Sequence, residues 1–322
     1  MNFGKKKKAN AVFEGGGVKC IGIAGALTVA DRYYDWNYVA GTSAGALVAA
    51  LVAAGCTASE IADKILELDY RRFADSNGVG RIPLLGPVLS LKFNLGIYKG
   101  DYIEEWIREN LREKGVRQFG DLVLQKNAKK RGGRYRLRVI ASDITSGKML
   151  ILPQDIAGYG IDPDYLEVAK AIRMSISIPF FFQPVPLVYQ DDNGENHMNY
   201  IVDGGVLSNF PVWLFDRDTG TEGLPAFGFK LTGPTTGKPN QIKGPISLLT
   251  ALFETMMEAH DTRFIEERNF DRTISIPTLG VRTSDFAISR DRVNELFNSG
   301  VVAAEQFFGE WDYRRYLIKH GW

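Results

Sequence analysis

The sequence predicts an α/β protein with a central, mostly parallel sheet and helices on both faces. Two short apolar runs, 10–14 and 38–40, each end in a glycine-rich turn, and each turn is followed by apolar residues at helical spacing. This repeated order of strand, turn and helix is typical of neighbouring parallel strands. The 322 residues are 45% hydrophobic, as in a globular protein with a large core. We therefore expect a single domain over residues 1–322.

The individual elements are assigned from hydrophobic periodicity and capping residues. Ile23, Ala26 and Leu27 recur at the spacing of one helical face. Thr57 or Ser59 is a suitable N-cap for the third helix. In chain order, strands are expected at 10–14, 38–40, 135–142, 199–202 and 226–231. Helices are expected at 21–34, 44–54, 59–68, 102–113, 166–174, 248–270 and 292–308.

Three segments interrupt this pattern. Glycine and proline recur through 78–100, which opposes a regular helix and predicts either a loop packed on the core or a mobile apolar flap over a cleft. The segment 178–188 is apolar but holds three prolines. The segment 232–244, with its glycines and prolines, is the best candidate for a flexible loop.

Charge is balanced overall and uneven locally. The formal net charge of +1 gives no strong field for nucleic acid, so no nucleic-acid partner is expected. Basic residues gather in 5–8, and seven Lys or Arg residues without an acid lie between 126 and 138. Two interpretations stay open for 126–138. It is either the solvated tip of a hairpin or a contact with anionic lipid, where each basic residue adds about 1 kcal/mol.

Cysteine content and hydropathy restrict the cellular setting. Cys20 and Cys56 are the only cysteines, which excludes a disulfide framework and a cysteine metal site and fits a reducing compartment. The residues after Lys8 are too few and too polar for the apolar region of a signal peptide. The longest stretch of small apolar residues, 44–55, is too short to span a bilayer. We therefore expect a cytoplasmic protein with peripheral membrane contact.

Ser43 is the candidate nucleophile. It is the centre of a Gly-x-Ser-x-Gly motif, flanked by Gly41 and Gly45, between an expected strand and an expected helix. This is the arrangement of a nucleophile elbow, in which the glycines allow a sharp turn and the serine hydroxyl projects from it. The helix that follows directs its free N–H groups and its positive dipole end at the same place.

Gly15, Gly16 and Gly17 are the candidate oxyanion hole. Consecutive glycines leave room for a ligand and present backbone N–H groups to an anion. A P-loop would need Gly-Lys-Ser/Thr after them, and a dinucleotide site would need a third glycine where Cys20 stands, so both phosphate-binding alternatives fit less well. Lys19 either adds positive charge beside the anion or is an ordinary solvated lysine.

Asp203 is the candidate general base. It ends an apolar strand and is followed by Gly204 and Gly205, which would free its carboxylate to reach the turn of another strand. A carboxylate of pKa near 3.9 is a weak base for a serine, so desolvation must raise its pKa. A turn-capping role for Asp203 is the simpler alternative.

A Ser–Asp–His triad is the rival arrangement. His260 or His320 would complete it in the chain order of α/β-hydrolases. His260 falls within an expected helix and His320 two residues from the C-terminus, whereas catalytic histidines usually lie on loops. His197 lies in a polar loop and is expected to be solvated.

These motifs together resemble the patatin-like phospholipases, a family related to the catalytic domain of cytosolic phospholipase A2. The resemblance covers residues 10–215 and implies a three-layer α/β/α patatin-like fold, with 216–322 as the helical C-terminal part of the same domain. It also implies a Ser43–Asp203 dyad without histidine and an oxyanion hole at 15–17. Relatives often have glycine where Cys20 stands. The segments that carry the likeness are 14–19, 41–45, 141–147, 172–179 and 203–211.

The expected activity is hydrolysis of ester-linked fatty acids from phospholipids, without a metal or organic cofactor. The resemblance supplies the lipid substrate, and the apolar segment 82–97, the phenylalanines 180–182 and the basic patches suit docking on a lipid interface. The phenylalanines are equally suited to the core. Two alternatives are an esterase or thioesterase acting on soluble acyl substrates, and a latent effector that needs a partner or ligand.

Overall fold

A computed structural model describes the chain. The residues described are 6–73, 75, 94–124, 133–191, 193–216, 224–233, 242, 244, 248–249, 251–253, 255–256 and 267–320. The expected loop at 78–100 lies largely outside them, as does most of 232–244.

A central sheet of eight strands organises the molecule, in the order β10-β9-β1-β2-β4-β8-β7, with β5 also paired to β4. The five strands from β10 to β4 are parallel, while β5, β8 and β7 run antiparallel to their neighbours. The prediction of a mostly parallel α/β sheet is confirmed. The strands are β1 Lys7–Phe13, β2 Tyr34–Thr42, β4 Leu137–Asp143, β5 Lys148–Leu152, β7 Val185–Gln190, β8 Asn196–Asp203, β9 Ala226–Thr232 and β10 Thr273–Pro277.

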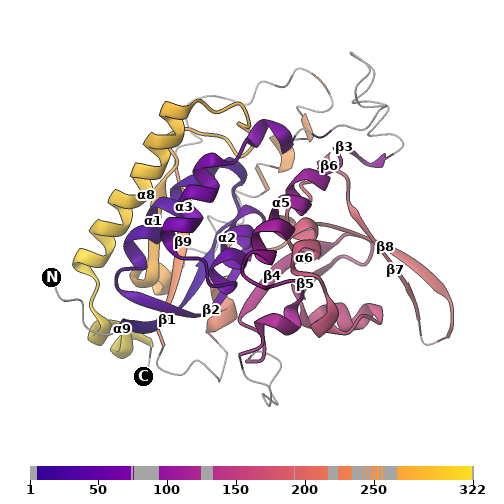
Figure 1. The fold of residues 1–322 in the computed structure, drawn as a ribbon, viewed down its shortest axis with the longest axis horizontal. Coiled ribbons are helices and arrows are strands. Elements are labelled where there is room, and N and C mark those ends of the chain that lie inside the picture. The colour runs from indigo at the N-terminus through magenta and orange to yellow at the C-terminus, as the bar shows by residue number, and fades with distance from the viewer. Residues whose placement is uncertain are drawn as a thin grey trace.

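Helices cover the sheet, as Figure 1 shows for α1, α3 and α8. Side chains alternate along the strands, so Phe13 of β1 joins the larger core beneath these helices, while Val12 joins a smaller core with Phe215 on the other face. A second, two-stranded parallel sheet pairs β3 Gly96–Tyr98 with β6 Phe180–Phe182. The α-helices are α1 Cys20–Ala30, α2 Ala44–Ala53, α3 Ala58–Glu67, α5 Asp101–Arg112, α6 Val168–Ser175, α8 Arg290–Glu310 and α9 Tyr313–His320.

The structure corrects several predicted element bounds. The first helix ends at Ala30 and not at Tyr34, because Tyr34 begins β2 and packs against Phe227. The expected helix 248–270 is wrong at its end, since Glu267–Arg272 is a 3-10 helix that leads into β10. Strands β3, β5, β6, β7 and β10 are not predicted from the sequence, because runs of three to six residues carry little periodic signal.

The basic segment 126–138 serves the fold where it is described. Arg134 pairs with Asp164, and Arg136 donates to the carbonyl oxygens of Trp36 and Ala53. Arg138 is buried and donates to the Leu214 carbonyl at 3.1 Å. Arg136 and Arg138 are therefore held inside the fold, whereas Arg134 is partly exposed beside Asp164. The remaining four basic residues lie outside the described part.

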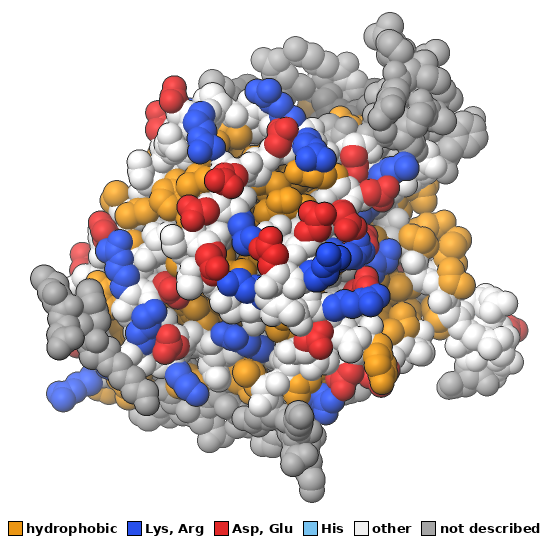
Figure 2. Space-filling model, in the orientation of Figure 1, with side chains coloured by type: hydrophobic (Ala, Val, Ile, Leu, Met, Phe, Trp, Pro, Cys, Tyr) orange, Lys and Arg blue, Asp and Glu red, His pale blue; other side chains and the backbone are white. Residues whose placement is uncertain are grey.

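Basic and acidic side chains are interspersed on the face seen in Figure 2, so neither sign of charge dominates it, in keeping with the net charge of +1. Within the described residues, no helix combines the length and apolar character needed to cross a bilayer.

Helices α1 and α8 cross at a close contact made by glycines. A Cβ on Gly300 would lie 1.8 Å from the Gly22 carbonyl oxygen, and a Cβ on Gly25 would lie 2.0 Å from the Phe297 carbonyl oxygen. Each helix therefore rests on the other's backbone. This contact holds α1, whose N-terminus follows the glycine turn 15–17, in its place against the sheet.

Gly300→Ala should lower the free energy of unfolding by about 1–3 kcal/mol, the usual cost of overpacking. The matched control is Gly309→Ala in the same helix, where no atom lies within 4 Å of the added methyl group. Alanine favours helix more than glycine, so this control should gain up to about 1 kcal/mol. Urea denaturation measures both, and equal stability of the two variants would contradict the close contact.

Candidate active site

Ser43 lies at a sharp corner between the end of β2 and the start of α2. Its backbone has φ 52° and ψ −130°, a conformation that non-glycine residues rarely adopt. The flanking glycines make this corner possible. A Cβ on Gly41 would lie 2.4 Å from the Gly45 carbonyl oxygen, and a Cβ on Gly45 would lie 2.2 Å from the Phe13 carbonyl oxygen. The motif therefore forms the strained elbow that its spacing predicts.

Asp203 contacts Ser43 directly. The Ser43 hydroxyl donates a hydrogen bond of 2.6 Å to Asp203 Oδ2, although the two residues are 160 positions apart. Asp203 is the last residue of β8, and its Oδ1 accepts the N–H of Gly205 at 2.8 Å. Gly204 is packed so that a Cβ would lie 2.3 Å from the Ile140 carbonyl oxygen. Both side chains are almost fully buried.

Burial sets the ionisation of Asp203. Loss of hydration raises its pKa from 3.8 to about 7, while the hydrogen bonds from Ser43 and Gly205 oppose part of that rise. A carboxylate with a pKa near neutrality is a much better proton acceptor than an ordinary aspartate. The desolvation that the chemistry requires is therefore present at this position.

No imidazole takes part in the described site. Of the three histidines, only the His197 side chain is described, and its Nε2 lies 3.1 Å from Asp191 Oδ2 on the β7–β8 hairpin. His260 and the side chain of His320 lie outside the described part. Ser43 and Asp203 are thus in hydrogen-bond contact without an intervening group.

The glycine turn lies beside the nucleophile. A Cβ on Gly15 would be 3.0 Å from the Ser43 Cβ. The Gly15 N–H donates to the Asn209 carbonyl at 3.2 Å, and Asn209 Nδ2 donates to the Gly15 carbonyl at 3.1 Å, so this pair fixes the turn. Within the described part of the chain, the N–H groups of Gly16 and Gly17 donate to no protein acceptor. The Gly15 N–H is committed to the fold, and those of Gly16 and Gly17 are available for an anion.

One further donor is adjacent to the nucleophile. Ala44, the first residue of α2, follows Ser43 directly, and its N–H also has no acceptor among the described residues. The residue after the nucleophile is the usual second source of an oxyanion hole in elbow enzymes. The signal for Ala44 was thus present in the sequence, although only the glycines were singled out.

A buried charge pair, Glu14 with Lys230, ties the glycine turn 15–17 to strand β9. Glu14 is 1% exposed, accepts the Leu231 N–H and lies 4.0 Å from the Lys230 Nζ. Both Lys230 and Leu231 belong to β9, so the contact ties the start of the glycine turn to the neighbouring strand. Lys19 is half-buried, and its Cε would lie 3.6 Å from a Cβ on Gly16.

An apolar pocket opens beside Ser43. Apart from Ser43 and Gly17, its walls are almost entirely aliphatic and aromatic. Burial raises the pKa of the Cys20 thiol to about 12, so this wall residue is neutral and does not compete as a nucleophile. The lining residues are Gly17, Cys20, Ser43, Ala44, Leu47, Ile65, Leu68, Tyr70, Phe73, Ile103, Ile176, Ile178, Phe182 and Phe286.

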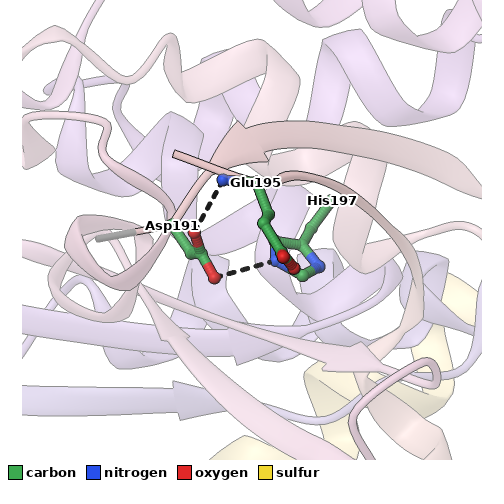
Figure 3. Close-up of side chains that lie close together, drawn as sticks. All are labelled: Asp191, Glu195 and His197. Atoms are coloured by element: carbon green, nitrogen blue, oxygen red, sulfur yellow. Dashed lines mark hydrogen bonds and ion pairs between the residues drawn. The ribbon is translucent and has the colours of Figure 1, made fainter. Parts of the chain in front are cut away.

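A separate group of side chains has ligand atoms close enough for a metal ion. Asp191, Glu195 and His197 lie at the β7–β8 hairpin, with these atoms all within 4.8 Å of one another (Figure 3). Asp191 already accepts N–H groups from Glu195 and Asn193 and contacts His197, and these hydrogen bonds hold its pKa below the ordinary value. The hairpin therefore uses this aspartate to close its own turn, and none of the three residues contacts the dyad.

Comparisons with known proteins identify relatives of this chain and of its fold. Residues 11–216 match the family model described as "Patatin-like phospholipase". The uncharacterized protein YqhO of Bacillus subtilis is 42% identical over 94% of this chain and 99% of its own length. The uncharacterized NTE family protein Rv2565 of Mycobacterium tuberculosis is 30% identical over 55% of this chain and 32% of its own length. The crystal structure of VipD from Legionella pneumophila shares the fold, with a TM-score of 0.53 and 18% identity over 95% of this chain and 67% of that one.

Asp203→Asn should gain stability relative to the wild type as pH rises. The raised pKa means that folded Asp203 holds its proton up to about pH 7, whereas the unfolded residue releases it near pH 3.8, so wild-type stability falls between these values. Asparagine does not titrate. Urea denaturation at pH 5 and pH 8 therefore should show the difference between variant and wild type moving in favour of the variant.

Asp143→Asn is the matched control for this experiment. Asp143 is also buried, but its hydrogen bonds with Ser146, Tyr159 and Asn199 outweigh burial and lower its pKa. Its substitution should therefore cost stability at both pH values. If Asp203→Asn lost stability between pH 5 and pH 8 relative to wild type, the neutral-range pKa would be wrong.

Proposed function

The chain belongs to the patatin-like phospholipase family, and from this premise we propose that it cleaves ester-linked fatty acids from glycerophospholipids through Ser43 and Asp203. Family membership implies lipid hydrolysis. The observation that carries the finer proposal is the 2.6 Å hydrogen bond between a buried serine on a strained elbow and a buried aspartate. Ser43 also lines a pocket whose other walls are almost entirely apolar, which suits an acyl chain.

In the acylation step, Ser43 Oγ attacks the ester carbonyl carbon while Asp203 Oδ2 takes the hydroxyl proton. The carbonyl oxygen becomes an oxyanion, which the N–H groups of Gly16, Gly17 and Ala44 are proposed to hold. These donors are fixed by the fold, so they need no reorganisation as charge develops. When the tetrahedral intermediate collapses, Asp203 gives its proton to the departing lysophospholipid alcohol.

Deacylation repeats the same steps with water. Asp203 takes a proton from a water molecule, which attacks the acyl-serine ester and releases the fatty acid. The proton then returns to Ser43 Oγ. The apolar pocket beside Ser43 is proposed to hold the acyl chain, because burying methylene groups there is favourable by about 0.8 kcal/mol each. Lys19, next to Gly16, is proposed to add positive charge beside the oxyanion or the lipid phosphate.

Ser43→Ala and Asp203→Asn should each abolish fatty-acid release, with losses of at least about a thousandfold, because nucleophile and base act as one unit. The assay is release of fatty acid from vesicles of mixed neutral and anionic phospholipid. His197→Ala is the control, because His197 hydrogen-bonds only within its hairpin, and it should keep wild-type activity.

Each other outcome of this assay identifies a different function. Activity that survives in Ser43→Ala would exclude the proposed nucleophile. A wild type that cleaves short soluble esters but not vesicles would support the soluble-substrate alternative. A wild type inactive on both would support a latent protein that needs an activator.

The rate should depend on the ionisation of Asp203. Because its pKa is about 7, only the deprotonated fraction can take the serine proton, so kcat/KM should rise tenfold per pH unit below about pH 7 and level off above it. A soluble ester substrate removes any effect of pH on vesicles. A profile that is already flat between pH 5 and pH 8 would show that another group is the base.

A further inference from the structure

We infer that Ser175 is a positioning residue for the nucleophile and that residues 175–177 fix Ser43 and Asp203 relative to one another. The inference rests on the proposed function, since it assumes that Ser43 and Asp203 react. Ser175 is the last residue of α6, and residues 175–177 connect that helix to the segment before β6.

The Ser175 hydroxyl is oriented by two hydrogen bonds. It donates its single proton to the Ile140 carbonyl at 2.6 Å and accepts the backbone N–H of Ser43 at 2.9 Å. Because a hydroxyl has only one proton, the bond to Ile140 turns the oxygen lone pairs toward Ser43. Ser175 is 0% exposed, so water is not at hand to replace it.

This bond acts on a strained corner of the chain. Ser43 has φ 52°, and such a conformation persists only where its surroundings hold it. The Ser43 carbonyl accepts the Ala46 N–H at 2.9 Å, which fixes one side of the residue through α2. Its N–H is fixed by Ser175. Without Ser175, the buried N–H of Ser43 would lack an acceptor, and the direction of Ser43 Oγ could change.

The same short segment also holds the base. The Ser177 carbonyl accepts the backbone N–H of Asp203 at 2.9 Å. The Ile140 carbonyl that receives the Ser175 proton also lies against Gly204, the residue after Asp203. Two residues of one segment therefore contact the backbones of nucleophile and base. The separation of Ser43 Oγ and Asp203 Oδ2 depends on where this segment lies.

The segment also borders the pocket. Ile176, between the two serines, and Ile178, just beyond them, are both pocket walls. A ligand in the pocket would therefore contact the element that positions the dyad.

The test measures the reactivity of Ser43 directly. A fluorophosphonate forms a bond between Ser43 Oγ and phosphorus, fluoride leaves, and Asp203 takes the serine proton. We expect Ser175→Ala to lower this rate by more than about fivefold, because small displacements of a nucleophile cost large factors in rate. On a soluble ester, kcat should fall while KM stays within about twofold, because the pocket walls are unchanged.

The matched control is Ser299→Ala in α8. Its half-buried hydroxyl lies 2.7 Å from the Pro277 carbonyl oxygen and 2.9 Å from that of Leu296, and it does not contact the site. It should react at the wild-type rate, which separates positioning of Ser43 from a general loss of a hydroxyl bond. Melting temperatures of all variants show that each is folded. Ser175→Cys, whose somewhat larger thiol is a poor acceptor, serves if Ser175→Ala does not fold, with the same slow reaction expected.

Each result has one meaning. A loss smaller than about fivefold in the folded Ser175 variant overturns the inference and leaves the proposed function standing, as does an equal loss in Ser299→Ala. A wild type that does not react with the fluorophosphonate overturns the proposed function and the inference with it.

Discussion

The hydrogen bond between Ser43 and Asp203 is the contact on which the arrangement of the site depends. It is 2.6 Å long and joins two buried side chains from turns that follow different strands. A carboxylate in such surroundings is costly to ionise, and the cost appears as the rise of its pKa to about 7. Burial therefore disfavours the ionised form of Asp203, and for the same reason its carboxylate can accept a proton near neutral pH.

The contact is possible because backbones approach closely around it. Gly41 and Gly45 remove the side chains that would block the elbow, and Gly204 does so beneath the base. The charge pair of Glu14 with Lys230 holds the glycine turn 15–17 against strand β9. A side chain at Gly41, Gly45 or Gly204 would clash with a backbone carbonyl oxygen. The site is therefore assembled where the ends of the parallel strands β1 and β2 meet the end of β8, which runs antiparallel to β4.

The pocket and the dyad share their walls. Ile176 and Ile178 belong to the chain segment that contacts the backbones of both Ser43 and Asp203, and Gly17 belongs to the turn that offers the oxyanion donors. Apolar side chains from α3, α5 and the segment before β6 close the space around them. The wall residues Ile176 and Ile178 are thus direct neighbours in sequence of Ser175 and Ser177, which hydrogen-bond to the backbones of Ser43 and Asp203.

The parallel sheet, the elbow at Ser43 and the importance of the turns at 15–17 and 203–205 can be predicted from the sequence, because these are local patterns. Glycine spacing and apolar runs state backbone conformation directly, and a strand followed by Asp-Gly-Gly places a carboxylate at a strand end. Strands β3, β5, β6, β7 and β10 could not be predicted, because strands of three to six residues carry little periodic signal. The roles of the three arginines at 134–138 could not be predicted, because they depend on tertiary contacts with Asp164, Ala53 and Leu214. Three properties follow only from the folded chain. They are the glycine N–H groups that lack an acceptor among the described residues, the burial that raises the pKa of Asp203 toward neutrality, and the hydrogen bond from the Ser43 N–H to Ser175, 132 residues away. These properties arise from contacts between distant segments, and no local pattern encodes them.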